Sequence, residues 1–183
     1  MKQNVADTVV NLIAVIVAVT DETPRVLIID SGRKIGLALP NGPFEPANHP
    51  SLESSLRRWV EDQTGLDLYY VEQLYTFGNR FRDTAEIDGG PRVVSVAYIA
   101  LTHEDAVESA GATWQDWYSF LPWEDWRHGR PRVLDEHIEP ALKSWVGEAK
   151  SAQRKKERRE RVNVTFGASG ASDMDAVLAL ERY

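Results

Sequence analysis

Long apolar runs alternate with short polar turns in the first part of the chain, a pattern typical of strands. From position 9 to 19 the chain is almost continuously apolar and rich in β-branched residues, which predicts a central strand over Val9–Thr20. The polar segment Asp21–Pro24 follows. Because its proline fixes φ, this segment predicts a turn into a second strand at Arg25–Asp30.

A helix is predicted after a proline-rich loop. The prolines at positions 40, 43, 46 and 50 keep this loop extended and non-helical. Ser51 is a natural N-cap for a helix, and Gly65 has the position of a helix-ending glycine. Five residues between them recur near helical spacing: Leu52, Leu56, Trp59, Val60 and Gln63.

Two more strands and a second helix follow this first helix. Tyr69–Phe77 and Arg92–Leu101 are predicted strands, and the polar stretch Arg80–Gly90 joins them. Asp135–Trp145 is predicted to be a helix. Four of the six tryptophans lie just before it, at Trp114, Trp117, Trp123 and Trp126. This tryptophan group is interpreted as hydrophobic packing or, equally, as a dimer interface.

Charge is distributed unevenly along the chain. Lys150–Arg161 holds seven basic and two acidic residues, a local charge of +5. Taking this +5 from the total of −7 leaves −12 for the rest, a body that would repel a nucleic-acid backbone. The basic segment is interpreted as a solvated helix with Lys/Arg–Glu pairs or as an accessory nucleic-acid contact. Past a flexible Gly167–Gly170 linker, the apolar helical face of Met174–Tyr183 either docks on the body or, as we favour, belongs to a longer protein.

Composition excludes several classes of site. The chain has no cysteine, which excludes disulfides, zinc–thiolate sites and thiol nucleophiles and fits a reducing cytoplasm. The apolar run at 9–19 is too short to cross a bilayer and is interrupted by Asn11. It also lacks the basic lead and the cleavage site of a signal peptide. We therefore expect a cytoplasmic protein with one good core and a small appendage.

The most informative stretch is Leu39–Leu66, with the sequence LPNGPFEPANHPSLESSLRRWVEDQTGL. It resembles the Nudix box, in which carboxylates on one helix hold Mg²⁺ against a diphosphate. When the two are aligned at Gly65, the box arginine falls on Arg58, and the three positions expected to be acidic fall on Trp59, Asp62 and Gln63. Two further positions also depart from the pattern: Gly42 lies two residues too far from Arg58, and Pro50 replaces a glutamate.

These departures affect the expected metal chemistry. A hard divalent cation needs several oxygen ligands, with carboxylates supplying the charge. One aspartate, one neutral amide and an indole do not supply that set, so the resemblance implies a Nudix frame that has lost catalysis. At most we expect a weak Mg²⁺ contact through waters at Asp62, whose other interpretation is a solvated side chain.

A second resemblance rests on EQLYTFGNRFR at Glu72–Arg82, RVVSVAYIAL at Arg92–Leu101 and the helix start Asp135–Ile138. These segments look like the Nudix-related regulators of NAD metabolism, in which a Nudix-like domain senses a nucleotide and a C-terminal winged helix-turn-helix domain binds DNA. The implied fold is α+β, a Nudix-like α/β/α sandwich with a mixed sheet and a C-terminal helical extension. The implied division is a ligand-sensing domain at 1–148, a basic helix and linker at 149–171, and the start of a further helical, DNA-binding region at 172–183.

In this resemblance, the loop after Phe77 would lie beside the nucleotide. Arginine forks suit phosphate oxygens, and aromatic rings stack on bases. The candidate ligand-binding residues are Arg80, Arg82, Arg92, Phe77, Asn79, Phe81 and Trp59. Each also has a plainer interpretation: ion pairing with Asp83, Glu86 or Asp88 for the arginines, core packing for the aromatics, and a turn cap for Asn79. His137 is interpreted as part of an ordinary helix start rather than as a catalytic base.

Three functions remain open at this point. The first is a non-catalytic effector-binding domain of a transcriptional regulator of NAD metabolism. Its ligand would be an NAD-related or adenine nucleotide such as ADP-ribose, with no cofactor required, and it would act as a homodimer. DNA would be bound through a region mostly beyond this chain. The second is a divergent pyrophosphohydrolase with Mg²⁺ held by Asp62, Glu61 and Glu45. The third is a protein-interaction scaffold without a ligand.

Overall fold

The computed structural model describes residues 8–32, 36–80, 82, 84–104 and 111–166. The chain separates into two compact units, Met1–Trp117 and Tyr118–Tyr183. The division expected at residues 148 and 171 stays a prediction, and the expected helical region at 172–183 lies outside the described residues.

The first unit is built on one mixed sheet. Its strand order is β3-β2-β1-β6-β5, with β4 also paired to β1 and β7 to β2. β1 runs parallel to β6, and the other pairings are antiparallel. The strands are β1 (Thr8–Thr20), β2 (Thr23–Asp30), β3 (Leu37–Ala38), β4 (Asn41–Pro43), β5 (Val71–Phe77), β6 (Arg92–Leu101) and β7 (Ala112–Asp116). The predicted strands at the start of the chain and at 69–77 and 92–101 are therefore confirmed.

A tight turn joins β1 to β2. The strands pair up to Thr20↔Thr23, so only Asp21 and Glu22 connect them. Both have left-handed backbone, with φ of 49° and 59°. Such two-residue turns match the twist of a hairpin and favour Asn-Gly or Asp-Gly, because L side chains resist positive φ.

Glu22→Gly is therefore expected to raise the free energy of unfolding by about 1 kcal/mol, since glycine adopts positive φ without a steric cost. Urea titration followed by tryptophan fluorescence measures this change. Glu22→Ala removes the same charge but keeps a Cβ, so an equal gain in that variant would contradict the backbone explanation.

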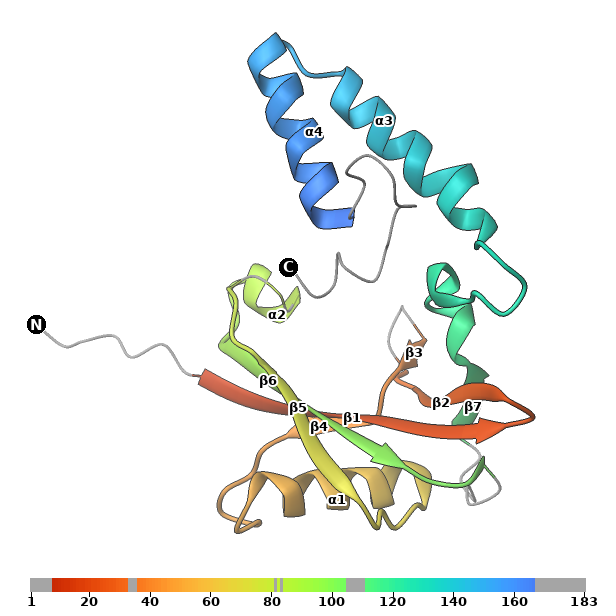
Figure 1. The fold of residues 1–183 in the computed structure, drawn as a ribbon. Helices are drawn as coiled ribbons and strands as arrows, with labels where there is room; N and C mark the ends of the chain where they lie inside the picture. Colours follow the sequence, from red (N-terminus) through yellow and green to blue (C-terminus); the bar gives the residue numbers. More distant parts are fainter. Residues whose placement is uncertain (1–7, 33–35, 81, 83, 105–110, 167–183) are drawn as a thin grey trace, which may run out of the picture. The chain divides into compact units, whose positions relative to one another are not determined.

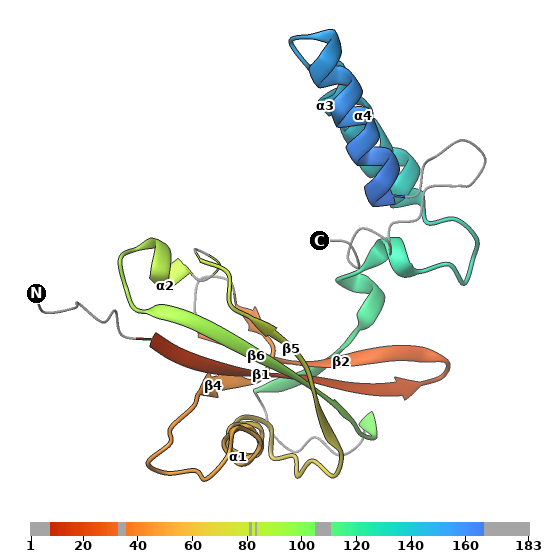
Figure 2. The ribbon, with the colours of Figure 1, turned by 60° about the vertical axis from the view of Figure 1, so that its left-hand side comes forward.

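Helix α1 (Leu52–Thr64) covers one face of the sheet (Figures 1 and 2). Ser51 caps its N-terminus by accepting the Ser54 N–H, and Gly65 ends it with φ of 75° while donating to the Glu61 carbonyl. These ends confirm the predicted helix. The core between α1 and the sheet is apolar and dense, and includes Leu12, Ala14, Ile16, Leu27, Leu56, Val60, Leu66, Val96, Tyr98 and Ala100.

The second unit is largely helical. A π-helical turn (η4, Leu134–Ile138) leads into α3 (Glu139–Gly147), and α4 (Ala152–Phe166) packs against α3. Pro140 has no N–H to donate, and the preceding Glu139 N–H bonds five residues back to Leu134. The small core of the second unit consists of the fully buried Leu134 and the partly buried side chains packed on it, Trp123, Ile138, Leu142 and Phe166.

The shorter helical segments are α2 (Thr84–Ile87) in the first unit, η2 (Trp117–Ser119) at the unit boundary and η3 (Pro122–Glu124) in the second. None of the helices within the described ranges has the length and apolar character that crossing a membrane requires.

The four neighbouring tryptophans are divided between the two units. Trp114 lies on β7 and packs against the core of the first unit, whereas Trp123 packs on Leu134 in the second. Trp126 is 45% exposed. Packing, one of the two roles considered for this group, therefore describes Trp114 and Trp123.

Candidate functional site

The Nudix-box helix is fastened to the short strand β4. The Trp59 indole lies on Gly42, and its Nε1 donates to the Pro43 carbonyl at 2.9 Å. The fit is so close that a Cβ built on Gly42 would lie 2.2 Å from the indole ring. Position 42 therefore requires glycine, because no space is left for a Cβ.

Gln63 lies one helical turn further along and bonds to the same strand. Its Oε1 accepts the Asn41 N–H at 3.1 Å, and its Nε2 donates to the Asn41 carbonyl at 2.7 Å. A side-chain amide both donates and accepts hydrogen bonds, so it can pair with the N–H and the C=O of the same residue. We refer to Trp59 and Gln63 with Asn41–Pro43 as the helix–strand clamp.

Asp62, the remaining box position, faces a different partner. Its carboxylate is 2.8 Å from an Arg58 guanidinium nitrogen, and Arg58 also pairs with Glu61 at 3.3 Å. Glu45, the third acid considered for a metal, accepts a hydrogen bond from Asn48 at 2.8 Å. The three acids of the pyrophosphohydrolase hypothesis are therefore each engaged locally.

Mg²⁺ does not fit this arrangement. Of the three positions expected to be acidic, one carries an indole, one an amide committed to Asn41, and one a carboxylate paired with Arg58. Nowhere in the described segments do three His, Cys, Asp or Glu side chains gather in a group that could hold a metal ion. A hard cation needs several oxygen ligands, and the helix–strand clamp does not provide them.

Two of the predicted residues, Phe77 and Arg82, meet where β5 ends. Tyr75 and Phe77 contact edge to face, with ring centroids 4.9 Å apart. The Arg82 guanidinium lies 3.6 Å from the centre of the Phe77 ring, a cation–π contact. The end of β5 thus places two aromatic rings, exposed at Tyr75 and half-buried at Phe77, next to a positive charge.

Arg92 ties together the two sides of the loop between β5 and β6. One guanidinium nitrogen donates to the Gly78 carbonyl, and the other lies 3.5 Å from Glu86. The ion pair with Glu86 was the plainer interpretation of this arginine, and it is present. Asn79 and Arg80 are exposed in the same loop, whereas Phe81 lies outside the described residues.

The predicted residues therefore form two sets. Phe77, Arg82 and Arg92 gather around the loop at 78–91, while Trp59 belongs to the helix–strand clamp. Their role in ligand binding stays a prediction. Sequence reasoning missed the partners of Gln63 on β4; the only signal was Gly42, a lone glycine between Pro40 and Pro43.

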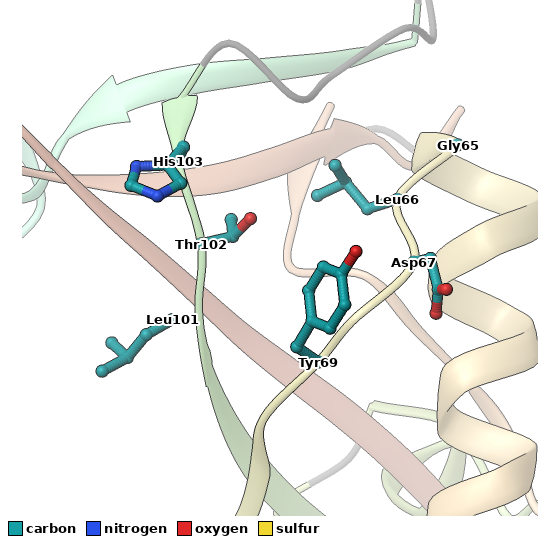
Figure 3. Close-up of a pocket in the computed structure, with 7 residues that line it drawn as sticks. All are labelled: Gly65, Leu66, Asp67, Tyr69, Leu101, Thr102 and His103. Carbon is teal, nitrogen blue, oxygen red and sulfur yellow. The ribbon is translucent and has the colours of Figure 1, made fainter.

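An open cavity of about 510 Å³ lies elsewhere, between the end of α1 and the end of β6. Thr102 and Tyr69 point into the space between the two segments, whereas Leu101 points away (Figure 3). Its other lining residues are Gly65, Leu66, Asp67 and His103. Arg92 begins β6 and Leu101 ends it, so this cavity and the loop at 78–91 lie at opposite ends of one strand.

His137 is exposed in the π-helical turn, where its neighbours Asp135 and Glu136 pair with Arg130 at 2.9 Å and Arg132 at 2.6 Å. These pairs fit the interpretation of an ordinary helix start.

No protein-family model and no curated protein matches the chain. Solved structures do. The Nudix domain of Shewanella oneidensis NrtR in complex with ADP ribose is 25% identical with a TM-score of 0.55, over 63% of this chain and 77% of that chain. A MutT/nudix family protein from Enterococcus faecalis is 24% identical with a TM-score of 0.53, over 63% of this chain and 46% of that chain. Less than half of the latter protein is thus represented here.

Shewanella oneidensis NrtR in complex with a 27mer DNA matches over 93% of this chain and 95% of that chain, with 17% identity and a TM-score of 0.53. At that identity the likeness concerns the fold. The expected Nudix-like α+β fold is therefore confirmed, and this fold is similar to that of the NrtR regulators.

Proposed function

We propose that this chain is a non-catalytic Nudix-like domain that binds an NAD-related or adenine nucleotide as the effector of a transcriptional regulator of NAD metabolism. The observation that carries this proposal is the helix–strand clamp. Trp59 and Gln63 occupy positions that the Nudix box gives to metal-binding acids, and both donate hydrogen bonds to the backbone of β4. Because helix positions that would bind a metal hold β4 in place instead, the helix–strand clamp supports a receptor rather than a hydrolase.

The ligand class is supported by the loop at 78–91 and by the ADP-ribose complex of the NrtR Nudix domain. Phe77 offers an aromatic ring to a base, and Arg82 lies over that ring with a guanidinium suited to phosphate oxygens. Asn79 and Arg80 are exposed in the same loop and add a polar side chain and a second charge. ADP-ribose carries both an adenine and a diphosphate, so it is the first compound to test.

The regulatory part of the proposal concerns the second unit. Helix α4 exposes Arg154, Lys155, Arg159 and Arg161, a set of charges suited to phosphate contacts. The NrtR structure with DNA shares the fold over 93% of this chain. These features support a protein that contacts DNA through its C-terminal part.

Calorimetric titration with ADP-ribose tests the nucleotide site. We expect measurable binding by the native chain and a loss of about tenfold or more in Arg82→Ala, because a charge-assisted hydrogen bond contributes roughly 1.5–3 kcal/mol. Arg132→Ala is the matched control, since its side chain is 86% exposed and pairs with Glu136 on its own helical turn. Equal affinities for the two variants, or no heat with the native chain, would refute the proposed site.

Turnover separates the receptor from the hydrolase. With Mg²⁺ and ADP-ribose or NAD, the protein should release no product at enzyme-like rates. Rapid cleavage that is abolished by Asp62→Asn would instead support the divergent pyrophosphohydrolase.

A further inference from the structure

The connection between β5 and β6 is long for a compact domain. From Gly78 to Arg92 it covers 14 positions along the chain, and most connections in compact domains have a median of about 4–6 residues. It contains the short helix α2 (Thr84–Ile87), which lies at the end of the sheet where β6 begins (Figure 2). A connection of this length needs contacts of its own to keep one conformation, because each ordered residue costs entropy.

The sheet does not hold the start of this loop. The last residue pair between β5 and β6 is Phe77↔Ser95, so the residues that begin β6, Arg92–Val94, lie past the end of their pairing with β5. On its other side β6 is paired with β1 from Arg92 onward. Arg92 is therefore fixed to the sheet, whereas Gly78, which directly follows Phe77, lies outside the pairing of β5 with β6.

The side chain of Arg92 supplies the contact that the strands do not. One guanidinium nitrogen donates to the Gly78 carbonyl, and the other lies 3.5 Å from the Glu86 carboxylate on α2. The Glu86 side chain is 10% exposed, so this ion pair is shielded from solvent on its acidic side. One side chain thus connects the end of β5 and helix α2 to the sheet. We refer to Arg92, Gly78 and Glu86 as the loop brace.

We propose that the loop brace positions Phe77 and Arg82 for the nucleotide, and that Arg92 acts through the loop rather than by touching the ligand. This inference rests on the proposed nucleotide site. It assigns different roles to two arginines that the sequence grouped together. Both terminal nitrogens of Arg92 face protein groups, whereas Arg82 is exposed and lies 3.6 Å from the centre of the Phe77 ring.

The expected benefit of the loop brace is preorganisation. A loop that already has its bound conformation loses less entropy when the ligand arrives, so the complex is tighter. Arg92 suits this role because its planar guanidinium contacts two groups at once in a fixed geometry, which a lysine ammonium does not.

Calorimetry with ADP-ribose on the Glu86→Ala variant tests the positioning role, because direct contact and positioning predict opposite results. If Arg92 held the diphosphate itself, loss of Glu86 would free its guanidinium and remove a negative charge, and binding would tighten. Positioning predicts binding weaker by about fivefold or more, since the apparent affinity falls with the fraction of binding-competent protein. Asp88→Ala is the matched control, because it removes an exposed negative charge from the same loop and should not weaken binding. Unchanged or tighter binding by Glu86→Ala would overturn the proposal.

Replacement of Arg92 gives a second test. Arg92→Lys keeps the charge but loses the fork, so it should weaken binding nearly as much as Arg92→Ala. A lysine variant with near-native affinity would show that charge alone matters at this position and would contradict the loop brace.

Hydrogen exchange of the ligand-free protein examines the loop brace without the nucleotide. Peptides that cover residues 84–90 include the Gly89 N–H, which donates to the Glu86 carbonyl at 3.2 Å. They should exchange faster in Glu86→Ala and Arg92→Ala than in the native chain and Asp88→Ala, while peptides from α1 stay unchanged. Unchanged exchange at 84–90 would refute the loop brace even if ADP-ribose binds. Faster exchange in a protein whose native form gives no heat with ADP-ribose would refute the nucleotide site instead, and the positioning role with it.

Discussion

Gly42→Ala is expected to destabilise the first unit by about 3 kcal/mol or more, which is at or beyond the usual upper range for overpacking. The added Cβ would lie 2.2 Å from the Trp59 ring, far inside van der Waals contact. The indole cannot retreat without breaking its hydrogen bond to the Pro43 carbonyl, so either β4 or α1 must shift. Chemical denaturation followed by circular dichroism measures the loss.

Two further variants identify the cause of that loss. Gly78→Ala is the matched control, because a Cβ there meets no atom within 4 Å, and it should change the free energy of unfolding little. In a Trp59→Ala background the Gly42→Ala penalty should largely vanish, since the clashing ring is gone. If the two penalties instead add, the contact with Trp59 is not the reason for glycine at this position.

Gln63→Glu is expected to cost about 1–3 kcal/mol at neutral pH. The carboxylate would still accept the Asn41 N–H, but it would face the Asn41 carbonyl with an oxygen instead of a donor. Protonation restores a donor, so the pKa of the new carboxyl should be raised in the folded state. The penalty should therefore be absent below the unfolded pKa of about 4.3 and grow to its full size above the folded one.

Stability relative to the native chain, measured from pH 3 to pH 8, tests this expectation. Gln73→Glu serves as the comparison, because Gln73 is exposed on β5 and its side-chain hydrogen bonds are long, at 3.4 and 3.5 Å. A pH-independent penalty at position 63 would contradict the hydrogen-bond argument. Recovery of stability on adding Mg²⁺ at neutral pH would show that an acid here holds a metal.

The sequence predicted those elements whose signals are local. The β-branched run after Val9, the Ser51 cap and the ending glycine at Gly65 each report on the backbone of their own neighbourhood, and the structure has them there. β7 (Ala112–Asp116) was not predicted, because this strand is short and forms by pairing with β2, which is distant in the sequence.

The candidate site was predicted less completely, for the same physical reason. Helical spacing places Trp59 and Gln63 one turn apart, but it does not indicate which residues they contact. That partner is backbone of a three-residue strand, and backbone hydrogen bonds leave almost no trace in residue identity. Only Gly42 carried a signal, because excluded volume selects glycine where a ring lies against the main chain.

The helix–strand clamp also accounts for the irregular spacing of the box. Trp59 holds Pro43 at one end of the segment, and the helix cap holds Ser51 at the other. The segment between them is therefore a closed loop with both ends fixed. Lengthening such a loop is inexpensive, at about 0.6 kcal/mol for each doubling. Two surplus residues can thus be accommodated between Pro43 and Ser51 without moving α1.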